Sequence, residues 1–190
     1  VSPHFTMFEK EIKKRKIAFE ALLDFEDIIN QSTNEILNTI KSGNKVLIIG
    51  NGGSASDAQH LSAEMVWKFE KIRRALPFIS LTDNVSSLTA ISNDDSFDNI
   101  FSRQIEALGI KNDILLSIST SGESKNVLNG VKLAKKMNIK TISLTGNNKN
   151  SSISLLSDLT INFPSSKTSI IQEMNLFYYH YLSKLIDNEF

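Results

Sequence analysis

Five short apolar runs, separated by stretches with helical periodicity, limit the possible folds of this chain more than any other feature. The runs lie at residues 45–49, 78–81, 114–118, 140–144 and 159–163. Continuous apolar, β-branched runs of this length are typical of strands buried on both faces. Helical patterns lie at about 55–69, 97–108, 125–137 and 169–187. The alternation predicts an α/β fold, with a five-stranded parallel sheet flanked by helices and joined by right-handed crossovers.

The N-terminal part of the chain has a different pattern. Residues 5–41 contain no glycine or proline, and apolar residues recur there at three- and four-residue steps. This spacing indicates one long helix or two joined helices, which we expect to end at residues 42–44 (SGN). The segment could fold back on the chain's own core or form a contact between subunits. We expect a single domain over residues 1–190, with an N-terminal helical segment over 1–42 and an α/β core over 43–190.

Composition excludes several classes of protein. The charges of the 21 basic and 21 acidic residues cancel, which argues against a protein whose main partner is a polyanion. The 41% of hydrophobic residues excludes a largely disordered chain. The absence of cysteine removes disulfides, thiolate metal sites and cysteine nucleophiles together. No apolar run approaches the ~20 residues that cross a bilayer, and no signal-like segment opens the sequence. We therefore expect a soluble, cytoplasmic protein.

Two loops that follow predicted strands carry residue types that bind anions. Residues 50–54 read GNGGS and residues 119–124 read STSGES, and each loop leads into a predicted helix. Glycines allow close backbone approach, while hydroxyls and the first N–H groups of a helix can hold a phosphate. Helix capping uses the same residues, but two such loops at successive strand ends favour an anion site. Neither loop is a Walker A or a dinucleotide-binding motif, so ATP and NAD are poor candidates.

Four polar residues on two predicted helices could together hold a metal ion. His60 and Glu64 are four residues apart and therefore share one helix face, while Gln172 and His180 lie on the last helix among mostly apolar residues. Two imidazoles, a carboxylate and an amide oxygen suit a tetrahedral divalent ion, and zinc is the natural choice. The alternative is that the histidines are ordinary packing residues. Residues 93–95 (NDD) suit either a helix cap or a loop that binds hydroxyl groups.

These motifs, in this order, resemble the sugar isomerase (SIS) family and specifically its phosphoheptose isomerase branch. Besides Glu64, the resemblance is carried by residues 50–60 (GNGGSASDAQH), 93–94 (ND), 100–104 (IFSRQ), 118–122 (ISTSG) and 171–173 (IQE). It covers nearly the whole chain, including the helical N-terminus. It implies the doubly wound, flavodoxin-like fold of that family, with long N-terminal helices for oligomerisation.

The resemblance also implies an activity, a metal and an assembly. The activity would be an aldose–ketose isomerisation of sedoheptulose 7-phosphate to D-glycero-D-manno-heptose 7-phosphate, the first step towards nucleotide-activated heptose for lipopolysaccharide or capsule. Glu64 and His180 would be the catalytic pair, and one Zn²⁺ per subunit would be held by His60, Glu64, Gln172 and His180. The substrate would be bound by Asn51, Gly52, Gly53, Glu64, Asn93, Asp94, Ser119, Thr120, Ser121, Ser124 and Gln172. The implied assembly is a homotetramer with active sites at subunit contacts, and no nucleic acid or membrane is implied as a partner.

The chain departs from the branch at three positions, and two other functions remain open. Lys68 and Ile170 stand where relatives usually carry arginine, and Ser56 replaces a usual alanine. A regulatory protein that binds the replication initiator uses the same scaffold but lacks the catalytic pair, so the presence of Glu64 and His180 favours an enzyme. The third interpretation is an isomerase of a pentose or hexose phosphate, because a phosphate loop does not read the length of the sugar.

Overall fold

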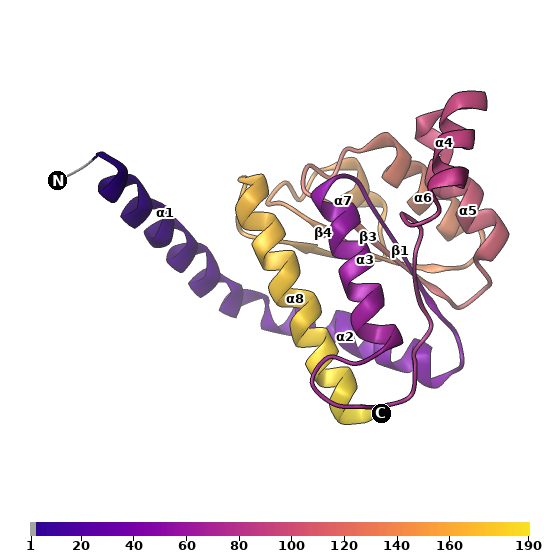
Figure 1. The fold of residues 1–190 in the computed structure, drawn as a ribbon, viewed down its shortest axis with the longest axis horizontal. Coiled ribbons are helices and arrows are strands. Elements are labelled where there is room, and N and C mark those ends of the chain that lie inside the picture. Colours follow the sequence, from indigo (N-terminus) through magenta and orange to yellow (C-terminus); the bar gives the residue numbers. More distant parts are fainter. Residues whose placement is uncertain (1–2) are drawn as a thin grey trace.

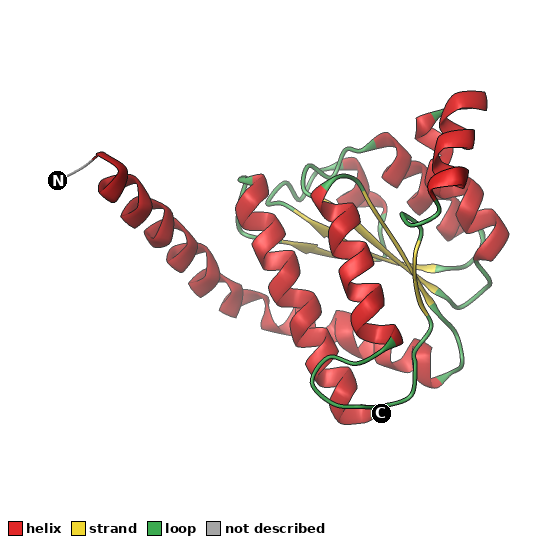
Figure 2. Ribbon diagram, viewed as in Figure 1, coloured by secondary structure: helices red, strands yellow, loops and turns green. Residues whose placement is uncertain are grey.

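A computed structural model describes residues 3–190, with side chains from residue 6 onward, and contains the predicted sheet. Its strands are β1 (Val46–Gly50), β2 (Phe78–Ser80), β3 (Ile114–Ser119), β4 (Lys140–Thr145) and β5 (Leu159–Asn162). All neighbouring strands pair in parallel, in the order β2-β1-β3-β4-β5. Figure 2 shows this sheet between its helices. The strand order is that of a flavodoxin-like doubly wound fold, which confirms the predicted fold class.

Helices cover both faces of the sheet. They are α1 (Pro3–Glu20), the 3-10 helix η1 (Ala21–Phe25), α2 (Glu26–Lys41), α3 (Gly53–Val66), α4 (Val85–Asp94), the 3-10 helix η2 (Phe97–Asn99), α5 (Ile100–Leu108), α6 (Lys125–Lys136), α7 (Ser152–Leu156) and α8 (Thr168–Glu189). Side chains of α2, α3 and α8 form one apolar core with the sheet, and those of α5, α6 and α7 form the other. In Figure 1, α3 and α8 lie side by side on one face.

Two helices were not predicted from the sequence. Helix α4 is short and buries no side chain completely, and it packs on the core through the partly buried Leu88 and Ile91, which is a weak helical pattern. Helix α7 has only five residues, which is too short for a periodic pattern to develop. The predicted helix at 55–69 begins two residues earlier, at Gly53, and ends at Val66.

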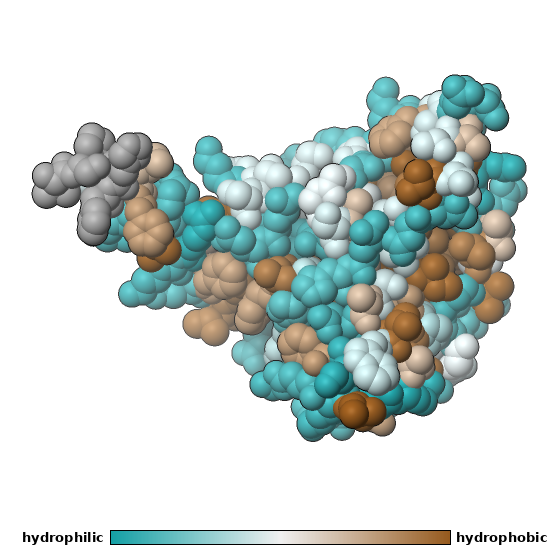
Figure 3. Space-filling view, viewed as in Figure 1, coloured by the Kyte–Doolittle hydropathy of each residue, from teal (hydrophilic) through white to brown (hydrophobic). Residues whose placement is uncertain are grey.

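The two parts of the N-terminal helical segment differ in how far they pack on the core. Helix α2 packs on the chain's own core through Ile29, Ile36 and Ile40, and it ends at a turn in which Gly43 has a φ of +83°. Helix α1 projects from the body, as Figure 1 shows. Among the described side chains of α1 and η1, Phe8 and Leu23 are 70% and 77% exposed, and Figure 3 shows apolar atoms along the projecting helix. Within residues 3–190, every helix is too short or too polar to span a membrane.

Candidate active site

Residues 50–54, the glycine loop, and residues 119–124, the serine loop, lie next to each other at the carboxyl edge of the sheet. The register of the parallel pair β1–β3 places Gly50 opposite Ile118, so the loops leave neighbouring strand ends. The order of strands reverses at this point, because β2 lies on one side of β1 and β3 on the other. Ligands of doubly wound folds bind at such a reversal. Gly52, with a φ of +57°, turns the chain from β1 into α3.

Side-chain hydrogen bonds join the two loops. The amides of Asn51 and Asn126 donate to each other at 2.8 Å in both directions, which ties the glycine loop to the first turn of α6. Ser119 Oγ donates to Ser124 Oγ at 3.3 Å. Ser124 is the N-cap residue of α6, but its side chain makes no capping hydrogen bond. The N-terminus of α6 therefore keeps donors that an anion can use.

A second group of polar side chains lies where α3 and α8 run alongside each other. His60 Nε2 is 3.0 Å from Glu64 Oε1, and the rings of His60 and His180 have centroids 5.3 Å apart. These three residues form the His–Glu–His cluster, and each offers one ligand atom within 4.8 Å of the others. The side chain of His60 is 45% exposed and that of Glu64 is 21% exposed, so a solute can reach the cluster.

His180 is set by its surroundings to be a neutral imidazole. Its ring stacks on Phe69 with centroids 5.1 Å apart. Burial, together with the nearby His60, lowers the pKa of His180, and the Glu64 carboxylate opposes this effect. A neutral imidazole has one nitrogen with a free lone pair, which can bind a metal, and one N–H, which can donate a hydrogen bond.

The chemistry of the three side chains fits a divalent metal ion. Two imidazole nitrogens and a carboxylate oxygen form the kind of donor set that holds catalytic zinc, with a further position open to water or substrate. The cluster is the one group of three or more His, Cys, Asp and Glu side chains within the described part of the chain with ligand atoms close enough to bind one ion.

The structure places the other predicted site residues outside this cluster. Gln172 lies eight residues before His180 on α8, or about 12 Å of helical rise, and its side-chain amide lies directly over Gly53, where a Cβ would collide with it. Asn93 and Asp94 are exposed at the end of α4, where the Asn93 amide donates to the Asp94 carboxylate at 2.7 Å. Helix α4 packs with α5 on the opposite face of the sheet from α8.

The loop residues also differ in exposure. Ser119 is buried, Thr120 and Ser124 are half-buried, and Ser121 is exposed and accepts a hydrogen bond from the Glu123 N–H. Of the positions that depart from the family pattern, Ile170 is buried in the apolar core. Within one chain, the two loops therefore form one group of candidate site residues, and the His–Glu–His cluster forms a second group. The cluster begins seven residues along α3 from Gly53, about 10 Å of helical rise.

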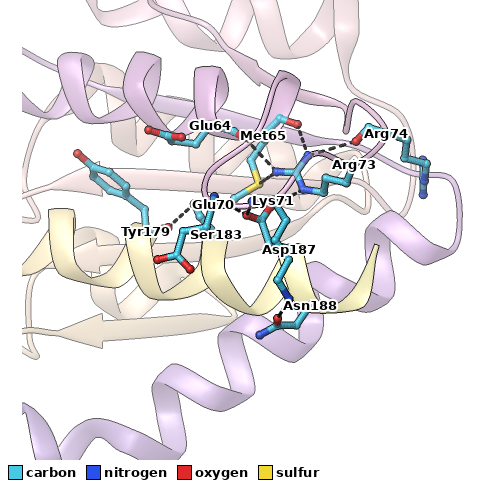
Figure 4. A network of polar contacts seen from close by, with 10 residues as sticks. All are labelled: Glu64, Met65, Glu70, Lys71, Arg73, Arg74, Tyr179, Ser183, Asp187 and Asn188. Carbon is cyan, nitrogen blue, oxygen red and sulfur yellow. Dashed lines mark hydrogen bonds and ion pairs between the residues drawn. The ribbon is translucent and has the colours of Figure 1, made fainter.

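A buried ion pair that the sequence analysis did not single out fixes the ends of α3 and α8. The side chains of Arg73 and Asp187 are 1% and 2% exposed, and Nε donates to Oδ1 at 2.8 Å. The same guanidinium donates to the carbonyl oxygens of Glu64 and Met65 at 2.9 Å each, in the last turn of α3. Figure 4 shows Arg73 between the end of α3 and Asp187 on α8. No periodicity marks Arg73, because it lies in the loop between α3 and β2.

Comparison with known proteins identifies the class that this fold and these loops define. The family model of the SIS domain matches residues 11–146, and the chain belongs to this family. The phosphoheptose isomerase of Helicobacter pylori is 43% identical over 185 residues, which are 97% of this chain and 96% of that protein. The solved phosphoheptose isomerase of Francisella tularensis superposes with a TM-score of 0.94 at 32% identity, covering 98% of this chain and 100% of that one. The solved phosphoheptose isomerase GmhA of Neisseria gonorrhoeae superposes with a TM-score of 0.84 at 36% identity, covering 96% of this chain and 96% of that one.

Proposed function

We propose that this protein is an aldose–ketose isomerase that converts sedoheptulose 7-phosphate into D-glycero-D-manno-heptose 7-phosphate. The observation that carries the proposal is the His–Glu–His cluster, which joins a carboxylate and an imidazole suited to proton transfer. The similarity to phosphoheptose isomerases over nearly the full length supports the substrate. The reaction would be the first step towards nucleotide-activated heptose for lipopolysaccharide or capsule.

The residues of the cluster suit the proton transfers of this reaction. Isomerisation moves a proton between C1 and C2 of the sugar and requires a base, a donor to the carbonyl oxygen and stabilisation of the negative charge that develops. Glu64 is assigned the base, because its carboxylate is partly exposed and next to His180. His180, held neutral, donates its N–H to the carbonyl oxygen.

Zinc is the metal that this donor set would hold, through His60, Glu64 and His180. When bound, it would polarise the sugar oxygens and stabilise their developing negative charge. Gln172 was predicted as a fourth ligand and as a substrate contact. Its orientation over Gly53 supports the substrate contact, whereas ligation would require the amide to turn towards His60.

The phosphate of the substrate is assigned to the two loops. The hydroxyls of Ser119, Thr120, Ser121 and Ser124, with the N–H groups that open α6, would hold the phosphate, and Asn51, Gly52 and Gly53 would line the sugar. Asn93 and Asp94 would bind sugar hydroxyls. Because α4 lies on the opposite face of the sheet from the cluster, we assign their contact to a site completed by a second copy of the chain.

We further propose that the chain is one SIS domain that assembles into a homotetramer in the cytoplasm. The exposed apolar side chains of α1 and η1 support self-association, since burying them requires a partner. The location follows from the substrate, because a charged sugar phosphate does not cross a bilayer unaided and is used where it is made.

The decisive experiment is incubation of the zinc-loaded protein with sedoheptulose 7-phosphate in D₂O, followed by NMR. We expect an aldose 7-phosphate with deuterium at C2, because the base exchanges its proton with solvent. Fructose 6-phosphate and ribulose 5-phosphate serve as the shorter sugars. Faster conversion of either would reassign the substrate, and no conversion of any sugar would favour a regulatory protein on the same scaffold.

Metal dependence is tested in the same assay. Treatment with a chelator should abolish the conversion, and added zinc should restore it. If activity survives complete removal of metal, the zinc proposal fails while the acid–base proposal for Glu64 and His180 stands.

A further inference from the structure

Tyr179 of α8 lies between the His–Glu–His cluster and a carboxylate that has no assigned function. Its hydroxyl oxygen is 2.9 Å from His60 Nδ1, on the side of the ring away from Glu64. The Asp57 carboxylate, one turn before His60 on α3, lies near the same hydroxyl, and burial together with this negative charge raises the pKa of Tyr179. The tyrosine is 2% exposed, and its ring meets the His60 ring edge-on with centroids 5.2 Å apart.

The direction of these hydrogen bonds follows from which groups carry protons. An ionised carboxylate accepts more strongly than a neutral imidazole, so we assign the one phenol proton to the side that faces Asp57. The phenol oxygen is then an acceptor towards His60, and Nδ1 must carry the N–H that it receives. A neutral imidazole has a single N–H, so the lone pair of His60 is on Nε2. That nitrogen faces Glu64 Oε1 at 3.0 Å, and two lone pairs at this distance need a cation between or beside them.

We propose that Asp57 and Tyr179 are positioning residues that fix the tautomer and the ring orientation of His60, so that Nε2 is the nitrogen presented to the metal. The inference rests on the proposed metal site. Hydrogen bonds from the non-ligating nitrogen of a histidine to a carboxylate, directly or through another group, orient the ring and make it a better ligand. Neither residue belongs to the His–Glu–His cluster, and both would act through His60.

Asp57 is itself held in place by a buried amide. Asn175 Nδ2 donates to Asp57 Oδ2 at 3.4 Å, and Asn175 is completely buried. Its own Oδ1 is buried without a hydrogen-bond partner within the described residues, which costs free energy. The amide is therefore oriented to donate to Asp57. Burial raises the pKa of Asp57, and the hydrogen bonds from Asn175 and Tyr179 oppose the rise because they stabilise the ionised form.

The test is the affinity for zinc, measured by competition with a chromophoric chelator. Tyr179→Phe removes only the hydroxyl, and we expect zinc to bind about 10–100-fold more weakly, the usual cost of losing such a partner. Tyr178→Phe is the matched control, because Tyr178 is the preceding residue, is equally buried and bonds to Ser32 instead. It should leave the affinity for zinc unchanged. Zinc affinity of Tyr179→Phe within twofold of the wild type would overturn the proposal.

A second pair of variants tests whether Asp57 acts through Tyr179. Asp57→Ala should weaken zinc binding as Tyr179→Phe does, and the double variant should be no weaker than the poorer single variant, because the two belong to one chain of hydrogen bonds. Asp57→Asn keeps an acceptor oxygen and should restore part of the affinity. Additive losses in the double variant would contradict the chain.

The tautomer can be observed directly, since the chain has only three histidines. In long-range ¹H–¹⁵N spectra of the zinc-loaded wild type, we expect His60 Nδ1 to be protonated and Nε2 to be the ligand. A metal-bound Nδ1 would disprove the assignment. If the wild type binds no zinc at all, the proposed metal site fails, whereas wild-type binding without an effect of Tyr179→Phe refutes only the role of Tyr179.

Discussion

At the residue scale, the proposed function gives Glu64 two tasks in one carboxylate. Its Oε1 is 3.0 Å from His60 Nε2 and lies among the ligand atoms of the cluster. A base that also binds a metal is weakened, because the cation stabilises the ionised form. Because the carboxylate has two oxygens, Oε1 would bind the metal and Oε2 would accept the proton. His180 has no such conflict, since one ring nitrogen can bind while the other donates.

Replacing Glu64 with glutamine tests this assignment. Glu64→Gln keeps the size of the side chain but removes the basic oxygen, so kcat should fall about 10²–10⁴-fold, as for other general acid–base groups. His180→Gln should have a similar effect. Because the proposal assigns both residues to one sequence of proton transfers, the double variant should be little slower than the slower single variant. Turnover is followed by NMR with sedoheptulose 7-phosphate, and unchanged melting temperatures show that each variant is folded. A fully active Glu64→Gln protein would disprove the mechanism.

At the element scale, the buried pair Arg73–Asp187 fixes how α3 and α8 lie relative to each other, and these helices carry the whole cluster. Burial alone would raise the pKa of Asp187, but donation from the Lys71 and Glu70 N–H groups and from Arg73 outweighs it and lowers the pKa. The loop after α3 is therefore tied to α8 by both oxygens of one carboxylate.

The prediction for this pair concerns stability and its pH dependence. Asp187→Asn leaves a buried guanidinium without its counter-charge, so the free energy of unfolding at pH 7 should fall by about 3–5 kcal/mol. Because the pKa of Asp187 is lower in the folded state, its contribution is present above about pH 3.9, the unfolded value, and is lost as pH falls through the folded value. The difference between variant and wild type should therefore shrink below about pH 4, measured by urea unfolding.

The control for this experiment is an exposed ion pair that joins the end of α2 to α8. Lys41 and Glu189 pair with side chains 48% and 46% exposed, so Glu189→Gln should change stability by less than about 1 kcal/mol. A loss of that small size for Asp187→Asn would mean that the buried pair does not stabilise the fold.

The serine loop gives a prediction about substrate affinity. Ser119→Ala removes a hydroxyl from the end of β3 and Ser124→Ala removes one from the N-cap of α6. Each should raise KM by the equivalent of about 1.5–3 kcal/mol, the range for hydrogen bonds to a charged group. Ser92→Ala is the control, because Ser92 is exposed on α4 and bonds only to the Leu88 carbonyl. If KM is unchanged in both loop variants, the phosphate binds elsewhere, and the glycine loop would be the next candidate.

How far the sequence predicts these elements depends on where each side chain lies. The strands are predictable because their residues are buried on both faces, as all five residues of β1 are. The shared face of His60 and Glu64 follows from their spacing, but the approach of His180 depends on packing between α3 and α8, which no local pattern encodes. Tyr179 lies in an apolar stretch of the sequence, so its pattern does not distinguish it from an ordinary aromatic residue of the core. Arg73 acts through backbone carbonyls, which have no sequence signature.

At the scale of the whole molecule, the two parts of the N-terminal segment differ in what they pack against. Helix α2 contributes Ile29, Ile36 and Ile40 to the core, whereas α1 projects and is joined to α8 by Arg15, which donates to Glu173 at 2.8 and 3.0 Å. A chain of this form has its own core, which the end of α1 joins through Ala18 and Phe19, but it also carries an arm on which Phe8, Ile12 and Ile17 are exposed.

Truncation should separate these two roles. Deleting residues 1–20 removes α1 and should give a folded protein in a lower oligomeric state than the expected tetramer, because the core keeps α2. Deleting residues 1–40 removes core side chains and should give aggregation. Light scattering coupled to size-exclusion chromatography measures both outcomes. A full-length protein that is monomeric at micromolar concentration would contradict the tetramer, and a tetrameric protein lacking residues 1–20 would contradict the role of α1.

In the proposed tetramer, the projecting arm would also make the stability of each subunit depend on the concentration of the protein. Where an apolar surface is covered only by another copy, association contributes to stability by mass action, so the melting temperature rises with total protein concentration. Dilution then acts on the molecule as a denaturant would, although no solvent condition has changed. With the proposed site completed by a second copy of the chain, the cellular abundance of the protein would become one of the variables that set its activity per molecule.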